Sequence, residues 1–178
     1  MRLYATILLF FLLVPKLLIA QSSFPDSWAG TYKGELQIYG VDSTRMKIAM
    51  QLDITAIQKD SVYDWKLTYD FNGTKDVRAY ELHVVDTNKG HYQIDEKNSI
   101  ILDAFLHTNT LTSFFSLIDS YIIASYTKEQ DTIVFEIISG KYESIAATGS
   151  TEHEGENIPE VKSYLVNGRQ RAVLTKVE

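Results

Sequence analysis

The sequence predicts an all-β fold, an antiparallel up-and-down β-barrel of about 8–10 strands. Three observations support this prediction. Apolar and polar residues alternate with a period of two along most of the chain, so successive side chains would point to opposite faces of a sheet. Turn-forming clusters separate the alternating runs, and helical periodicity is weak. After the first 20 residues the only prolines are Pro25 and Pro159, and both lie outside the strongly patterned region.

Residues 1–20 have the pattern of a cleaved signal peptide. Arg2 precedes an apolar run over residues 3–14, which has the length of a signal-peptide core and is short for a membrane span. Ala20 is a small residue at the expected cleavage edge, so Gln21 would begin the mature chain. We expect export, to the periplasm or as a secreted protein, and a single β-barrel domain over residues 21–178. An uncleaved N-terminal anchor is the alternative.

Composition excludes several classes of protein. The chain of 178 residues has a net charge of −6, and loss of Arg2 and Lys16 with the leader leaves 15 basic against 23 acidic residues, or −8. Such an acidic chain has no electrostatic basis for binding nucleic acid or an anionic membrane surface. It has no cysteine, which excludes disulfides and thiol chemistry. No second long apolar stretch follows the leader, so we expect no stable membrane insertion after cleavage.

The first half of the mature chain contains four expected strands. They are residues 34–39, 46–57, 63–71 and 78–84. The run over 46–57 is the clearest, with apolar residues on one side and mostly polar residues on the other. Asn72-Gly73 lies between the third and fourth runs and is a strong hairpin signal, because both residues tolerate positive φ.

The second half has shorter and more apolar runs. The expected strands are residues 99–106, 111–118, 121–126, 132–138, 144–148, 161–166 and 169–177. Asn167-Gly168 lies between the last two and predicts a second two-residue hairpin. Residues 149–160 lack alternation and carry four Glu, which predicts an exposed loop at the mouth of the barrel. A β-sandwich remains the alternative, although barrel closure would remove the exposed edges of such long strands.

The segment from Trp28 to Tyr32 and the run that follows it resemble the opening of a calycin barrel, the lipocalin and fatty-acid-binding group. In that group a basic side chain of the last strand packs across the tryptophan. The resemblance therefore implies a contact between Arg171, on the last expected strand beside Arg169, and Trp28. The order Trp-x-Gly departs from the usual Gly-x-Trp, and the lipocalin cysteines are absent. A tryptophan that simply fills the core or plugs one end is the alternative.

An aromatic stripe is the best functional clue. Tyr63, Trp65, Tyr69 and Phe71 share one face of a strand, and Tyr80 lies on the next strand. Inside a barrel these side chains either fill the interior or line a pocket. We predict that the five residues bind a small, largely apolar ligand. A packed interior without a cavity is the alternative.

Motifs for catalysis, metals and cofactors are not found. The sequence lacks His-Glu-x-x-His, Gly-x-Ser-x-Gly and a glycine-rich phosphate loop, and its four histidines have no ligand spacing. We therefore expect no catalytic residues, no metal site and no cofactor, and the sequence names no protein partner. Two alternatives to ligand binding remain. One is a filled barrel or sandwich that recognises a protein or glycan through its surface, and the other is an enzyme on this scaffold.

Overall fold

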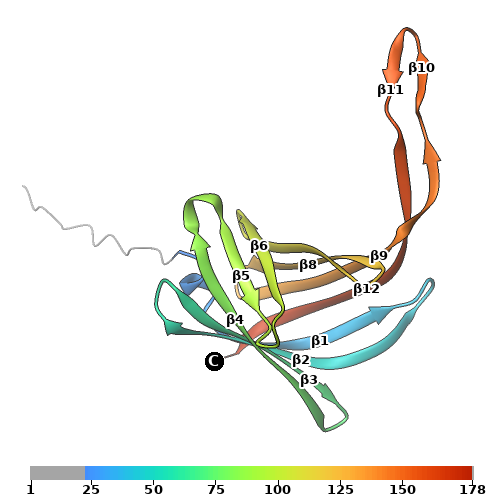
Figure 1. The fold of residues 1–178 in the computed structure, drawn as a ribbon. Helices are drawn as coiled ribbons and strands as arrows, with labels where there is room; N and C mark the ends of the chain where they lie inside the picture. The colour runs from blue at the N-terminus through green and yellow to red at the C-terminus, as the bar shows by residue number, and fades with distance from the viewer. Residues whose placement is uncertain (1–22, 178) are drawn as a thin grey trace, which may run out of the picture.

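The computed structural model describes residues 23–177, which form a closed ten-stranded antiparallel barrel with a long two-stranded arm (Figure 1). The predicted all-β up-and-down barrel is confirmed, and the sandwich alternative is excluded. The predicted leader lies outside the described residues. The two helical segments, η1 (Asp26–Trp28) and η2 (Thr87–Lys89), are single 3-10 turns. Within residues 23–177 no helix is long and apolar enough to cross a membrane.

Strand order follows the chain around the barrel. The barrel strands are β1 (Gly30–Tyr39), β2 (Thr44–Gln58), β3 (Val62–Phe71), β4 (Thr74–Asp86), β5 (His91–Asp95), β6 (Ile101–His107), β7 (Thr110–Leu117), β8 (Ser120–Glu129), β9 (Thr132–Thr148) and β12 (Val161–Val177). Each strand from β1 to β8 pairs with the next one along the chain, β9 pairs with β12, and β12 pairs with β1 to close the ring. Closure leaves the barrel without a free sheet edge at the β1–β12 seam.

The two Asn-Gly dipeptides have different structures. Asn72 and Gly73 have φ values of 53° and 95° and join β3 to β4 in the predicted hairpin. The prediction of a second hairpin at Asn167-Gly168 is wrong, because β12 runs through this dipeptide with an irregular register against β9. A Cβ added at Gly168 would lie 2.2 Å from the hydroxyl oxygen of Ser139. Gly168 therefore lies within a strand, against the Ser139 side chain, and not in a turn.

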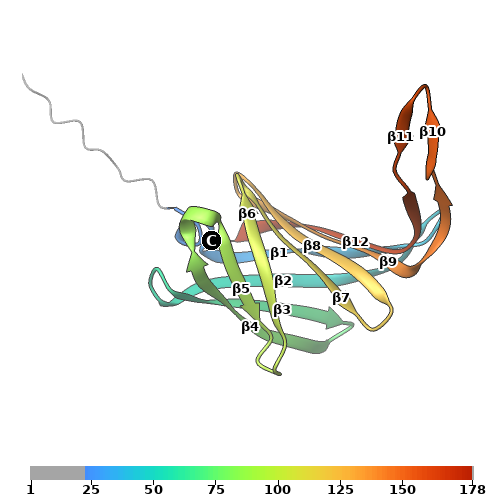
Figure 2. The same cartoon turned by 45° about the horizontal axis from the view of Figure 1, so that its top comes forward.

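Beyond this irregular register, β9 and β12 continue together as an arm that leads away from the barrel (Figures 1 and 2). Its tip is a small hairpin of β10 (Thr151–His153) and β11 (Glu156–Ile158). Residues 149–160 are almost all exposed, as predicted, but they do not form the loop expected at the mouth of the barrel. They extend the arm because strand pairing satisfies backbone groups that a loop would leave to water.

Alternate turns lie at opposite ends of the barrel because consecutive strands are antiparallel. The terminal end carries the N-terminal segment, the end of β12 and the turns at 59–61, 87–90, 108–109 and 130–131. The arm end carries the arm and the turns at 40–43, 72–73, 96–100 and 118–119. The two ends differ in how they are closed.

Aromatic side chains plug the terminal end. The ring of Phe24 packs edge-on against Trp28 and Tyr92, with centroid distances of 4.7 and 4.8 Å. The buried Tyr63 hydroxyl donates to Asp26 Oδ1 at 2.8 Å, which ties the N-terminal segment to the wall. Trp28 is therefore an end-plug tryptophan, as the alternative reading of its motif held.

The predicted contact between Arg171 and Trp28 is wrong. Arg171 lies opposite Gln37, well along β1 from Trp28, because the β1–β12 register brings Val177 to the start of β1. Lys176, and not Arg171, lies beside the start of β1, where its ammonium donates a hydrogen bond to the Ala29 carbonyl at 2.8 Å. A basic residue of the last strand thus meets the first strand, but five residues later than predicted.

We predict that Trp28→Ala lowers the free energy of unfolding by about 3–5 kcal/mol, the usual cost of truncating a buried aromatic side chain. Urea denaturation followed by circular dichroism measures this change. Phe114→Ala, at an aromatic residue that is 67% exposed on the outer wall, is the matched control and should cost less than about 1 kcal/mol. Equal midpoints for the two variants would contradict the plug.

Candidate functional site: the arm-end interior

Burial inside the barrel decreases from the terminal end to the arm end. Inward-facing side chains nearer the terminal end, such as Tyr32 and Tyr63, are fully buried. Toward the arm end the inward-facing Tyr69 and Tyr80 are only partly buried, and Phe71 is 44% exposed. The interior is therefore plugged at one end, and its side chains become more exposed toward the other. We call the inward-facing surface formed by Trp65, Tyr69, Phe71, Arg78, Tyr80 and Tyr126 the arm-end interior.

The wall beside this region has incomplete strand pairing. Strand β4 pairs with β5 only from Glu81 onward, so the described chain supplies no partner on that side for residues 74–80. Strands β6 and β7 pair only from Phe105 to His107, at the terminal end. Figure 2 shows the two strands diverging toward the arm end. The backbone hydrogen-bond ladder of the described chain is therefore incomplete beside the arm-end interior.

Trp65 supplies an unsatisfied hydrogen-bond donor at the bottom of the region. Its side chain is fully buried, and among the described residues its Nε1–H has no hydrogen-bond partner. The ring of Tyr126 lies edge-on to the indole at a centroid distance of 5.2 Å. The Tyr126 hydroxyl is close enough for the indole N–H to oppose the rise in its pKa, but the pair does not reach hydrogen-bond geometry.

Three tyrosines around Trp65 are held in their neutral form. Burial raises the pKa of Tyr69 to about 12, with a further contribution from Tyr80. Burial, followed by Glu96, raises the pKa of Tyr80. Burial also raises the pKa of Tyr126 strongly. At neutral pH the three hydroxyls can therefore donate or accept hydrogen bonds without adding charge to the interior.

One positive side chain lies near the mouth. Arg78 shares the inward register of β4 with Tyr80, and its guanidinium contacts Asp76 Oδ2 at 2.8 and 3.1 Å. The hydrogen bond with Asp76 raises the pKa of Arg78, and both side chains are about half exposed. This ion pair gives the mouth a polar rim above apolar walls.

The structure divides the five predicted ligand-binding residues among three places. Tyr63 lies at the plugged end with its hydroxyl bound by Asp26 and by the Asp60 backbone N–H. Trp65, Tyr69 and Tyr80 lie together in the arm-end interior, and Phe71 lies at its rim. The sequence prediction missed Tyr126 and Arg78. Arg78 alternates in step with Tyr80 and could have been found, whereas Tyr126 comes from β8, across the barrel.

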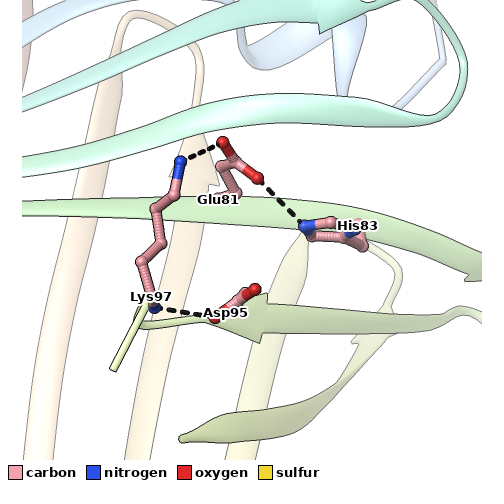
Figure 3. Close-up of polar contacts among 4 residues, drawn as sticks. All are labelled: Glu81, His83, Asp95 and Lys97. Carbon is pink, nitrogen blue, oxygen red and sulfur yellow. Dashed lines mark hydrogen bonds and ion pairs between the residues drawn. The ribbon is translucent and has the colours of Figure 1, made fainter. Parts of the chain in front are cut away.

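Histidine–carboxylate pairs occur on the outer wall. His83 Nε2 lies 3.2 Å from Glu81, which also accepts a hydrogen bond from Lys97, while Asp95 accepts the Lys97 backbone N–H (Figure 3). The hydrogen bond from Lys97 lowers the pKa of Glu81. The cluster links the β5–β6 turn to β4 and faces away from the arm-end interior. Among residues 23–177 no group of three His, Asp or Glu side chains could hold a metal ion.

The outer wall also carries an apolar groove of about 400 Å³ beside the base of the arm. It is lined by Phe114, Tyr121, Ile123, Ile138, Gly140, Tyr164 and Val166. The ring of Tyr121 contacts those of Tyr142 and Tyr164 at centroid distances of 4.3 and 5.9 Å, which joins the barrel wall to the arm. Exposed aromatic surface of this kind is typical of a binding surface.

Comparison with known proteins supports the barrel type. No family model and no curated protein matches the chain. Among solved structures, the S-type phycobiliprotein lyase CPES from Guillardia theta is similar, with a TM-score of 0.55 and 6% sequence identity, over 84% of this chain and 88% of that chain. At this identity the similarity concerns the fold alone, a lipocalin-like antiparallel barrel. The calycin resemblance is thus supported for the barrel, and not for the Trp28–Arg171 contact.

We predict a loss of stability at high pH that depends on Tyr69. Because its pKa in the folded state lies above the unfolded value near 10, the neutral hydroxyl favours the folded state. This contribution is fully present below pH 10 and is lost as the pH rises toward 12. Between these values Tyr69→Phe should lose about 1–2 kcal/mol less than the wild type in urea denaturation. Tyr164→Phe, at an exposed tyrosine of the arm, is the control, and identical pH profiles for all three proteins would contradict the burial of Tyr69.

Proposed function

We propose that this protein is a binding protein of the lipocalin-like type that holds a small, largely apolar ligand in the arm-end interior. The observation that carries the proposal is the buried Trp65 Nε1–H, which has no hydrogen-bond partner within residues 23–177. A buried donor left unsatisfied costs about 1–3 kcal/mol, which a ligand acceptor at this position would recover. The plugged terminal end and the open arm end give one direction of access.

The surrounding residues define the chemistry of the ligand. Aromatic rings form the walls, so the ligand body is apolar, and rings or conjugated chains fit best against them. Its inner end carries a hydrogen-bond acceptor for Trp65 and Tyr126. Its outer end lies near the neutral hydroxyls of Tyr69 and Tyr80. Burial of a few hundred Å² at roughly 25 cal/mol per Å² supports micromolar binding after the cost of association.

Recognition through the outer surface is the second candidate function. The apolar groove beside Phe114 and Tyr121 favours it, because both side chains are exposed on the barrel wall. A partner of this groove would leave Trp65 untouched. The two candidates therefore predict different effects for variants at Trp65 and Phe114.

Export is also part of the proposal. The basic residue, apolar core and small cleavage-edge residue of the leader support a mature chain that begins at Gln21 and is released to the periplasm or the exterior. The absence of cysteine means that such a chain depends on its barrel core alone for stability.

We expect the delipidated protein to bind retinoids or fatty acids with a saturable change in tryptophan fluorescence. Trp65→Phe removes the N–H donor but keeps an aromatic ring, so it should weaken binding of retinoic acid or a fatty acid about tenfold. Isothermal titration calorimetry measures this change without relying on the lost fluorophore. Phe114→Ala is the matched variant and should bind as the wild type does. The reverse pattern, with Phe114→Ala impaired and Trp65→Phe normal, would favour the outer groove.

We expect the exported protein to have the intact mass of residues 21–178. Mass spectrometry of protein purified from the periplasm or the medium measures it. Protein that retains residues 1–20 in the membrane fraction would contradict cleavage and identify the leader as an anchor.

A further inference from the structure

The arm has the features of an incomplete interface. Over residues 142–166 it is a ribbon of two strands, to which no third strand of the described chain adds. It exposes apolar side chains along its length, with Ile145 and Val166 66% and 65% exposed and Leu165 also exposed. A two-stranded ribbon alone in water is marginally stable, and its open edges and apolar side chains favour association.

A groove of about 670 Å³ lies at the base of the arm, on the side of the β1–β2 turn. Its lining includes the fully exposed Val41 and two arginines, Arg45 and Arg169. Arg169 pairs with Glu136 at 2.9 Å and its guanidinium lies 5.4 Å from the ring centre of Tyr39. Arg45 forms no ion pair within the described part of the chain. The lining also includes Asp42, so the groove offers apolar surface, two arginines and one carboxylate, and Arg45 is the arginine without an ion pair among the described residues.

The opposite end of the arm is acidic. Glu152, Glu154 and Glu156 lie within or next to the β10–β11 hairpin, and all three are exposed. Repulsion between such clusters opposes any arrangement that brings two tips together. The tip is instead complementary to the arginine groove at the base. The arm thus has an acidic tip and a groove with arginines at its base. Two arms packed antiparallel would place each tip against the other copy's groove.

We propose that two copies of this chain form a two-fold dimer in which the arms pack antiparallel, with the acidic tip of each copy in the arginine groove of the other. The exposed apolar residues of the two arms then cover one another along the shared length. The arm over residues 142–166 contains 25 residues. With the β1–β2 turn it matches the roughly 20–30 residues a side of a stable interface.

Sedimentation velocity of the purified protein tests the proposal at 0.1 M salt over a range of about 1–100 μM. We expect the mass to change from that of one chain to that of two as concentration rises. At 1 M salt, where screening shortens the reach of charges to about 3 Å, association should weaken. Arg45→Glu and the triple variant E152K/E154K/E156K should each weaken association about tenfold or more. Lys59→Glu, at a turn of the terminal end, is the charge-matched control and should associate as the wild type does.

Mixing the two charge variants gives the sharpest result. In the mixed dimer the lysine tip meets the groove of the Arg45→Glu copy and the glutamate tip meets the unchanged groove, so an equimolar mixture should associate more strongly than either variant alone. Circular dichroism checks that every variant is folded. A protein that stays monomeric throughout, a dimer insensitive to both changes, or a mixture without recovery would overturn the proposal. So would a monomer that instead co-sediments with phosphatidylcholine vesicles, which would make a lipid surface the occupant.

Discussion

The pairing of β1 with β12 is the constraint on which the rest of the structure depends. It closes the sheet from Thr31 opposite Val177 to Ile38 opposite Gln170. A closed antiparallel barrel sends alternate side chains into one shared interior, which here collects aromatic residues from most of the wall. The same register brings Lys176 to the Ala29 carbonyl, beside the N-terminal plug. Closure around the ring and closure of the terminal end therefore depend on the same strand pair.

The barrel consequently has a packed half and a half whose side chains are more exposed. Aromatic packing of Phe24 with Trp28 and Tyr92 fills the terminal side, and Trp65 and Tyr126 lie where the two halves meet. Toward the arm end the barrel wall is incomplete, because β5 and β6 are short and the pairing of β4 with β5 and of β6 with β7 stops early. Trp65 lies at the boundary. Its ring packs in the core, and its Nε1–H has no hydrogen-bond acceptor among the described residues. Under the proposed function this donor would meet the ligand acceptor, and the packed half would hold the indole in place.

Alternation in the sequence was enough to predict which side chains share a face. It grouped Tyr63, Trp65 and Tyr69 correctly on the inward side of one strand. Alternation carries no information about depth, however, so it could not show that Tyr63 lies against the N-terminal plug. It also could not place Tyr126 opposite Trp65, because that contact depends on how far around the ring β8 lies from β3.

Local turn chemistry was decisive only where no neighbouring strand competed with it. Within residues 23–177, Asn72-Gly73 has no neighbouring strand to pair with and forms a turn. Asn167-Gly168 lies beside β9, where Gly168 pairs with Ser139, and continues as a strand. The arm also depends on long-range strand pairing. Residues 144–148 and 161–166 could each be predicted as a strand, but their pairing into one ribbon outside the barrel could not. Long-range pairing, which no window of sequence contains, decided both cases.

The central claim is that the Trp65 indole N–H awaits a ligand acceptor. The chain has two tryptophans, so a ¹⁵N-labelled sample gives two indole N–H signals, and Trp65→Phe assigns them. Titration of the delipidated protein with retinoic acid or a fatty acid should move the Trp65 signal downfield and saturably, because a hydrogen bond deshields the proton, while the Trp28 signal changes little. A saturable shift confined to residues of the outer groove, with the Trp65 signal unmoved, would contradict the account.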